Sequence, residues 1–158
     1  MSEAVVDDFP LSPEERLKLG NQLCFPLYAA AKEVVRRYTP LLDLLGLTYT
    51  QYLTMMVLWE KETVSVSELG AELYLDSGTL TPLLKKMESK GLITRRRSSA
   101  DERRVEVAVT EEGAALREKA LGVPPQMASC MDLDADEAAL LGSLLHKLLD
   151  NVRESERE

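Results

Sequence analysis

The stretch "DSGTLTPLLKKMESKGLITRRRSSADERRVEVAVTEEG", residues 76–113, decides the fold. Its first part has the spacing of apolar residues expected of a helix over residues 76–90, and Gly91 is the expected C-terminal stop. Residues 93–97 and 105–109 then alternate with a period of two on either side of a polar loop. Two such runs around a loop are typical of a β-hairpin. The stretch therefore predicts a helix followed directly by a hairpin.

Just upstream, the capping box "SVSE" at residues 65–68 predicts a short helix that ends near Tyr74. A turn near Leu75 separates it from the helix that starts at Asp76, and this spacing is typical of a helix-turn-helix. Pro82 lies early in the second helix, so that helix either starts near Thr79 or carries a local distortion. With the hairpin as its wing, this part of the chain is predicted to be a winged helix-turn-helix.

Both ends of the chain are expected to be helical. The capping boxes "SPEE" and "TYTQ" open helices over residues 12–38 and 48–61, and further helices follow at 110–121 and 134–152. The terminal helices have wide apolar faces with little of their own monomer to cover them, so we expect them to pair with a second copy. The predicted fold is mainly α: one domain over residues 1–158, with dimerisation helices at 12–38 and 114–153 and a winged helix-turn-helix at 48–113.

The charge is unevenly distributed. The chain has a net charge of −8, but residues 85–104 carry eight Lys or Arg against three acidic residues. This basic segment is therefore +5 and the rest of the chain is −13. A basic segment in an acidic protein is a local electrostatic footprint, and local charge matters more for docking than the total. Double-stranded DNA is the expected partner.

Other function classes find little support in the composition. The sequence has no apolar run long enough to cross a membrane, and its acidic start "MSEAVVDDFPLSPEER" does not resemble a signal peptide, so we expect a cytoplasmic protein. Two cysteines without a C-x-x-C motif and a single histidine argue against a structural metal. No cofactor is expected either.

Candidate DNA contacts come from both parts of the winged motif. The first turns of the second helix of a helix-turn-helix meet base edges in the major groove, and cations further along it suit phosphates. Arginines at the wing tip suit a narrow, A·T-rich minor groove, and Asp101 lies close enough to hold the Arg103 guanidinium by a bidentate pair. The candidate residues are Ser77, Thr79, Thr81, Lys85, Lys86, Asp101, Arg103 and Arg104. The alternative is that the hydroxyl side chains only cap the helix and the arginines line a solvated hairpin.

The same residues resemble a known family. The stretch 76–113, with its Asp101-Glu102-Arg103 wing and Thr110-x-x-Gly113, is similar to the core of the MarR family of bacterial winged-helix repressors. Beyond about the first ten residues, the segments "NQLCFPLYAA", "RRYTPLL", "LGLTYTQYLTMMVLWE" and "LYLDSGTLTPLLKK" closely resemble one branch, the organic hydroperoxide sensors (OhrR).

The resemblance implies a homodimer that represses a peroxidase gene from an inverted-repeat operator and releases it when Cys24 is oxidised by an organic hydroperoxide. It implies that Tyr38 and Tyr49 hydrogen-bond the reactive thiolate. Cys130 is positioned like the second cysteine that a subset of the branch carries, which condenses with the first across the dimer. A single-cysteine mode, in which a small thiol caps Cys24, stays open.

The spacing around Cys24 makes a further prediction. Leu17, Cys24, Tyr28, Ala31, Val35 and Tyr38 would share one interior face of a helix over residues 12–38, so Cys24 would lie in an apolar pocket. Tyr38 is fourteen residues further along, about 21 Å away at ~1.5 Å per residue. A Tyr38 phenol that contacts Cys24 must therefore come from the partner subunit. Pro26 removes one backbone hydrogen bond and is expected to kink the helix beside the thiol.

Three functional classes follow from these observations. The first is a peroxide-sensing repressor. The second is a repressor released by a small phenolic ligand, in which Cys24 is only a core residue. The third, a thiol peroxidase, has the least support, because no Thr-x-x-Cys helix start activates the cysteine and an enzyme has no use for a wing. We therefore do not expect an enzyme.

Overall fold

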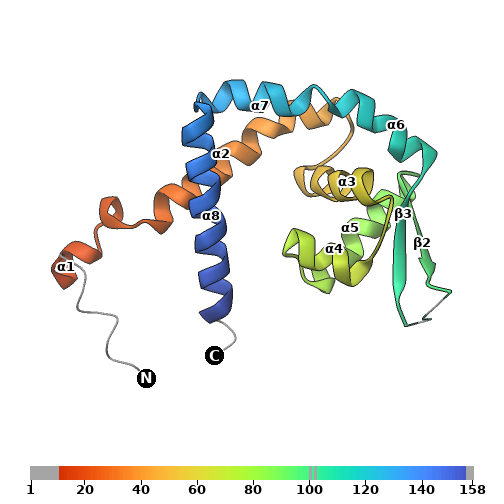
Figure 1. Ribbon diagram of the computed structural model, residues 1–158, viewed down its shortest axis with the longest axis horizontal. Helices are drawn as coiled ribbons and strands as arrows, with labels where there is room; N and C mark the ends of the chain where they lie inside the picture. The colour runs from red at the N-terminus through yellow and green to blue at the C-terminus, as the bar shows by residue number, and fades with distance from the viewer. Residues whose placement is uncertain (1–10, 100, 102, 156–158) are drawn as a thin grey trace. The chain divides into compact units, whose positions relative to one another are not determined.

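The computed structural model describes residues 11–99, 101 and 103–155 (Figure 1). The chain divides into two compact units, residues 1–115 and residues 116–158, and each is described by itself. The elements, in chain order, are α1 (Pro13–Arg16), the 3-10 helix η1 (Leu19–Asn21), α2 (Cys24–Asp43), α3 (Tyr49–Lys61), β1 (Thr63–Ser65), α4 (Val66–Leu73), α5 (Ser77–Ser89), β2 (Ile93–Arg97), β3 (Val105–Val109), α6 (Glu111–Ala120), α7 (Val123–Met131) and α8 (Ala135–Ser155).

The winged helix-turn-helix is confirmed. Helices α4 and α5 are joined by a short turn, and the hairpin of β2 and β3 follows α5 directly. The Asp76 side chain caps α5 at its start, and the helix continues through Pro82 without a break. Of the two sequence alternatives for this helix, the late start near Thr79 is therefore wrong, because α5 begins at Ser77.

The wing belongs to a three-stranded antiparallel sheet in the order β1-β3-β2. In the hairpin, Ile93 pairs with Val109 and Arg97 with Val105. On the other side of β3, Thr63 of β1 pairs with Ala108. Strand β1 was not predicted, because three residues are too few to show a period of two.

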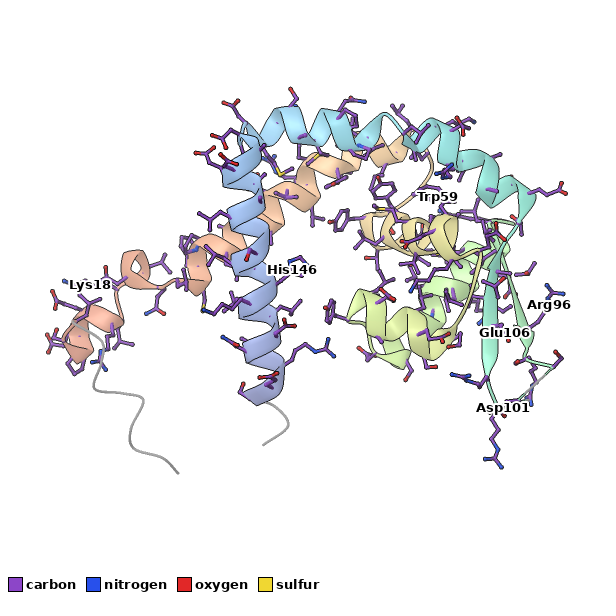
Figure 2. The ribbon with its side chains drawn as sticks, viewed as in Figure 1. Lys18, Trp59, Arg96, Asp101, Glu106 and His146 are labelled. Atoms are coloured by element: carbon purple, nitrogen blue, oxygen red, sulfur yellow. The ribbon has the colours of Figure 1, made fainter. Side chains whose placement is uncertain are left out.

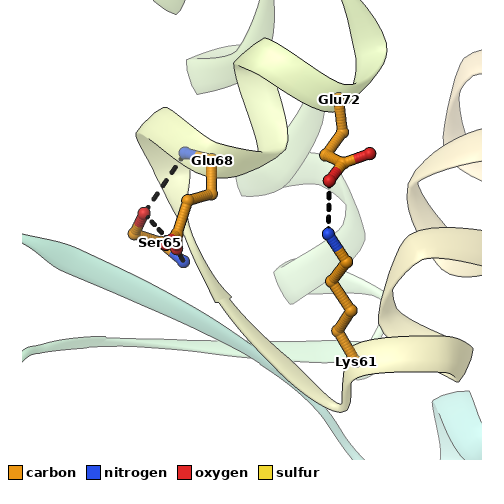
Figure 3. A network of polar contacts seen from close by, with 4 residues as sticks. All are labelled: Lys61, Ser65, Glu68 and Glu72. Carbon is orange, nitrogen blue, oxygen red and sulfur yellow. Dashed lines mark hydrogen bonds and ion pairs between the residues drawn. The ribbon is translucent and has the colours of Figure 1, made fainter.

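The core of the first unit lies among α3, α4, α5 and the sheet. The apolar side chains buried there include Met55, Leu58, Leu69, Leu80, Leu84, Met87, Ile93 and Val107. Figure 3 shows how α4 is attached to its neighbours: Lys61 at the end of α3 pairs with Glu72, while Ser65 and Glu68 form a reciprocal capping box. Burial and capping together fix the orientation of the helix-turn-helix on the sheet.

The Thr110-x-x-Gly113 sequence has a structural reason. The Thr110 hydroxyl donates to the Gly91 carbonyl at 2.6 Å and accepts the Gly113 N–H at 3.0 Å. A Cβ on Gly113 would lie 2.2 Å from the carbonyl oxygen of Leu92, which no side chain tolerates. The indole N–H of Trp59 donates to the Gly113 carbonyl at 2.9 Å. Only glycine allows α6 to start this close to the end of α5.

The N-terminal helix differs from its prediction. No continuous helix runs from residue 12 to 38: α1 ends at Arg16, a 3-10 turn follows, and α2 begins only at Cys24. Gly20 and Asn21 in between are weak helix formers. Pro26 is the third residue of α2, where a backbone N–H has no intrahelical partner, so proline sits there without breaking a helical hydrogen bond. The expected kink at Pro26 is therefore wrong.

Three other prolines lie within helices without ending them. Helix α2 runs through Pro40 to Asp43. Pro124 and Pro125 stand in the first turn of α7, where proline is well tolerated. The last helix, α8, is 21 residues long and buries none of them. Among the described residues, no helix combines the length and apolarity that a membrane span requires.

Candidate nucleic-acid interface and thiol site

Helix α5 presents two opposite faces. Leu80, Leu84 and Met87 are buried in the core of the unit. The candidate DNA contacts Ser77, Thr79, Thr81, Lys85 and Lys86 are all exposed. The structure therefore brings these five side chains to the solvent side of one helix, beginning at its first residue.

Two of the exposed hydroxyl groups also have partners within the helix. Thr79 donates its backbone N–H and its hydroxyl to the Asp76 carboxylate, both at 2.9 Å. These hydrogen bonds keep the pKa of Asp76 below its ordinary value. The Thr81 hydroxyl donates to the Ser77 carbonyl at 2.7 Å. Capping and exposure thus coexist, and the oxygen lone pairs of both threonines remain available to accept a hydrogen bond.

The wing tip places its charges differently from the prediction. Figure 2 shows Asp101 at the far end of the hairpin. Its carboxylate accepts the backbone N–H of Arg103 at 3.0 Å, so the predicted bidentate pair with the Arg103 guanidinium is wrong. An Asp side chain readily closes a turn onto the N–H two residues on. Arg103 and Arg104 are both exposed, so Asp101 shapes the loop that presents them.

Two cations of the basic segment are used within the protein. Arg95 of β2 donates to the Glu88 carboxylate through its Nε at 2.9 Å and its Nη2 at 2.6 Å. Lys90, at the C-terminal cap of α5, donates to the Gly46 carbonyl and to the Gln51 side chain. The count of eight cations therefore overstates what this segment can offer to a ligand, because two of them are held by groups of the protein. A count of charges carries no signal for this, because both partners of Lys90 are distant in sequence.

Two further arginines were not among the predicted contacts. Arg96 and Arg97 are exposed on β2, and Figure 2 shows Arg96 pointing away from the hairpin. Arg96 stands opposite Glu106 of β3 in the sheet register. The period-2 pattern could have identified Arg96 as an outward-facing residue. Buried Ile93 and half-buried Arg95 share one face of β2, and Arg96 lies on the other face. Both add cations to the same end of the unit.

The tyrosines named in the sequence analysis do lie together. The rings of Tyr38 on α2 and Tyr49 on α3 have centroids 4.8 Å apart, and Tyr52 lies 5.9 Å from Tyr38. Burial raises the pKa of all three phenols above the ordinary value, so each is a neutral hydroxyl at physiological pH. The cluster therefore offers hydrogen-bond donors at the point where α2 and α3 meet.

Cys24 lies at the opposite end of α2. It is the first residue of a continuous helix that reaches Asp43, so the separation of about 21 Å from Tyr38 of the same chain follows from the helical rise. In this single chain Cys24 is exposed, as are Tyr28 and Leu17. The predicted interior face from residue 17 to 38 is therefore wrong for the isolated chain, and Leu17 does not belong to α2 at all.

Cys130 is the last residue but one of α7, and its side chain is exposed. Cys24 and Cys130 lie in different units. Among the residues that the structure describes, no group of three or more His, Cys, Asp or Glu side chains is placed to hold a metal ion.

Comparison with known proteins gives consistent results. The sequence profile described as "Transcriptional regulator SarA/Rot" matches residues 36–119. The chain is 49% identical over 140 residues to the organic hydroperoxide resistance transcriptional regulator of Bacillus subtilis, an alignment that covers 89% of this chain and 95% of that protein.

Among solved structures, the chain is similar to AbfR of Staphylococcus epidermidis. Reduced AbfR bound to DNA has a TM-score of 0.73 and 33% identity, with 89% of this chain and 99% of AbfR covered. A structure of disulfide-formed AbfR has a TM-score of 0.60 and 30% identity, with 92% of this chain and 97% of that chain covered.

Proposed function

Because this chain belongs to the MarR-like, SarA/Rot-type family of winged-helix transcriptional regulators, in the branch of the organic hydroperoxide regulators, we propose that it is a repressor that releases its operator when an organic hydroperoxide oxidises Cys24. The family members it matches are transcription regulators and not enzymes.

The observation that carries the DNA-binding part is the exposed face of α5 beside an exposed wing. Ser77, Thr79 and Thr81 would meet base edges in the major groove, and Lys85 and Lys86 would contact phosphates. Arg103 and Arg104 would enter the adjacent minor groove, where A·T-rich sequence favours arginine. A homodimer would place two such faces on an inverted repeat. The DNA-bound structure of the similar AbfR supports this assignment.

Dimerisation is proposed from the apolar side chains that the single chain leaves exposed. Leu140, Leu141, Leu144 and Leu145 of α8 are exposed, and so are Leu23, Leu27 and Tyr28 near the start of α2. An apolar helix face that its own chain leaves exposed marks a protein interface. We assign residues 12–38 and 114–153 to the dimer contact and residues 48–113 to DNA binding.

The switch is proposed to be a thiol reaction. The Cys24 thiolate attacks one oxygen of the hydroperoxide, the O–O bond breaks, an alkoxide leaves and takes up a proton, and Cys24 becomes a sulfenic acid. Tyr38 and Tyr49 of the partner subunit, as neutral phenols, would donate to the thiolate. Cys130 of the partner subunit would then displace water from the sulfenic acid and form a disulfide. Disulfide-formed AbfR is a precedent in a similar protein.

The experiment is a DNA-binding titration with fluorescence anisotropy on the DNA upstream of the protein's own gene. Wild type should release DNA with cumene hydroperoxide and rebind it with dithiothreitol. Cys24→Ser should bind equally well and ignore the peroxide; release of this variant by peroxide would refute the sensor assignment. Cys130→Ser should lose the dimer-sized band on a non-reducing gel. If a small thiol caps Cys24 instead, the Cys130→Ser variant should release DNA after peroxide only when a small thiol is also added.

The same titration separates the second candidate. A repressor governed by a phenolic ligand would release DNA with salicylate, with or without dithiothreitol, and Cys24→Ser would respond as wild type does. The peroxide sensor should not respond to salicylate.

A further inference from the structure

The ammonium of Lys90 connects three helices of the first unit. Lys90 is the C-terminal cap of α5, and its Nζ lies 2.7 Å from the carbonyl oxygen of Gly46 and 3.1 Å from Oε1 of Gln51. Gly46 lies in the turn that ends α2, where its N–H donates to the Asp43 carbonyl at 3.0 Å. Gln51 is the third residue of α3. One side chain thus ties the end of α2 and the start of α3 to the end of α5.

The acceptor on α3 is firmly held. Gln51 is 1% exposed, and its Oε1 also accepts the backbone N–H of Thr48 at 3.2 Å. In return, Thr48 Oγ1 accepts the Gln51 N–H at 3.4 Å, which completes the capping box of α3. The Lys90 bond therefore shares its acceptor oxygen with the cap that starts this helix. A change in the start of α3 must change the geometry at Lys90.

The tyrosine pair stands on the same two helices. Tyr49 is the first residue of α3, between Thr48 and Gln51, and its ring contacts Tyr38 on α2. A shift of these phenols against each other moves the end of α2 relative to the start of α3. Because Lys90 holds both, such a shift either breaks one of its two hydrogen bonds or moves the end of α5.

The wing is coupled to the same end of α5. Glu88, two residues before Lys90, receives two hydrogen bonds from Arg95 of β2. The end of α5 is thus fastened to the tyrosine-bearing helices through Lys90 and to the wing through Glu88. Helix and wing would move as one body.

We propose that Lys90 is a positioning residue that transmits the state of the Tyr38–Tyr49 pair to the DNA-contacting helix α5. This inference rests on the proposed function, because it assumes that oxidation near the phenols changes DNA affinity. It assigns to Lys90 a role different from that of Lys85 and Lys86, which are free of the α2–α3 turn and face the solvent side of α5. The coupling runs entirely within residues 38–95.

The test compares Lys90→Met with Lys90→Arg and with the matched control Lys61→Met. Methionine keeps the unbranched stem without the charge, and arginine keeps a cation that can donate to two acceptors. Lys61→Met removes a lysine of the same unit that pairs with Glu72, away from the tyrosines. For each protein, operator affinity is measured before and after cumene hydroperoxide, and Cys24 sulfenic acid is trapped and quantified by mass spectrometry.

Wild type and Lys61→Met should show the same ratio of oxidised to reduced dissociation constants. Lys90→Met should form sulfenic acid at the wild-type rate and bind DNA in the reduced state within about threefold of wild type, but its ratio should fall by about tenfold. Lys90→Arg should recover most of the ratio. A wild-type ratio in Lys90→Met overturns the inference. It is also overturned if Lys90→Met loses reduced-state affinity well beyond threefold and Lys90→Arg restores it, because that pattern would mark Lys90 as a phosphate contact.

A second measurement on the wild-type protein does not depend on how the variants fold. Amide hydrogen exchange of residues 46–51 and of residues 86–92 should change together on oxidation. A change confined to the first segment overturns the inference. If the wild type itself keeps its operator after oxidation, the proposed function has failed; if the wild type responds and Lys90→Met responds equally, only the inference about Lys90 has failed.

Discussion

Helices α3 and α8 are both amphipathic, yet they differ in how much of each helix the single chain buries. Helix α3 has 13 residues and buries five of them, including Met55 and Leu58. Helix α8 has 21 residues and buries none, although its leucines recur at helical spacing. Periodicity therefore predicts that a helix has an apolar face, but not whether its own chain covers that face. The apolar face of α3 is covered within its own winged-helix unit, whereas we expect the apolar face of α8 to be covered by a second copy of the chain.

The largest effect is expected in the buried helix. Leu58→Ala should lower the free energy of unfolding by about 2–5 kcal/mol, because Leu58 is fully buried and the cavity left behind cannot collapse completely. Urea unfolding followed by circular dichroism measures it. Met56→Ala on the same helix, at a 44% exposed position, is the matched control and should cost much less. Equal costs at both positions would contradict the burial of α3.

A smaller effect, of a different kind, is expected in α8. Leu144→Ala should weaken self-association by about tenfold to a hundredfold, since each chain of a dimer would lose part of a buried leucine. Sedimentation equilibrium measures it over a range of protein concentrations. Lys147→Ala on the same exposed helix should leave association unchanged. If Leu144→Ala associates like wild type, α8 does not carry the dimer contact.

The next prediction concerns the start of α6. Trp59→Phe removes the N–H that donates to the Gly113 carbonyl and should destabilise the first unit by about 0.5–1.5 kcal/mol. Trp59 is the only tryptophan, so thermal unfolding must be followed by circular dichroism and not by indole fluorescence. An unchanged unfolding midpoint would show that this hydrogen bond adds nothing beyond the packing of the ring.

The smallest effect is a pH dependence. The hydrogen bond from Arg95 lowers the pKa of Glu88 below its ordinary value, so the folded state favours the carboxylate. Its stabilisation is present above the unfolded pKa and is lost as pH falls through the lower, folded pKa. The gap in melting temperature between wild type and Glu88→Gln should therefore be largest near neutral pH and close in acid. In an Arg95→Met background the gap should vanish at every pH.

Much of the fold could be predicted because its signals are local. Each of the capping boxes at Ser12, Thr48 and Ser65 forms as predicted. The hairpin follows from alternation along two short strands. The long N-terminal helix was wrong because its apolar spacing continued across Gly20 and Asn21, where the chain turns instead. Strand β1 was missed because three residues pair with β3 only through tertiary contact.

The candidate site divides in the same way. The exposed side of α5 follows from helical spacing alone, since Leu80, Leu84 and Met87 mark the buried side. The predicted partner of the Asp101 carboxylate was wrong. Proximity in sequence permits a bond from either the guanidinium or the backbone N–H of Arg103, and the geometry of the turn determines which one forms. The use of Lys90 was invisible, because it depends on residues about forty positions away.

By itself, the sequence determined which segments are helices and strands, which side chains share a face, and which family the chain resembles, because these depend on neighbours within a few residues. Only the tertiary structure decided which cations bond to other groups of the same chain, which phenol rings come into contact, and which apolar faces the chain leaves uncovered. Those outcomes depend on groups that approach in space from distant parts of the chain, and no short-range pattern encodes that approach.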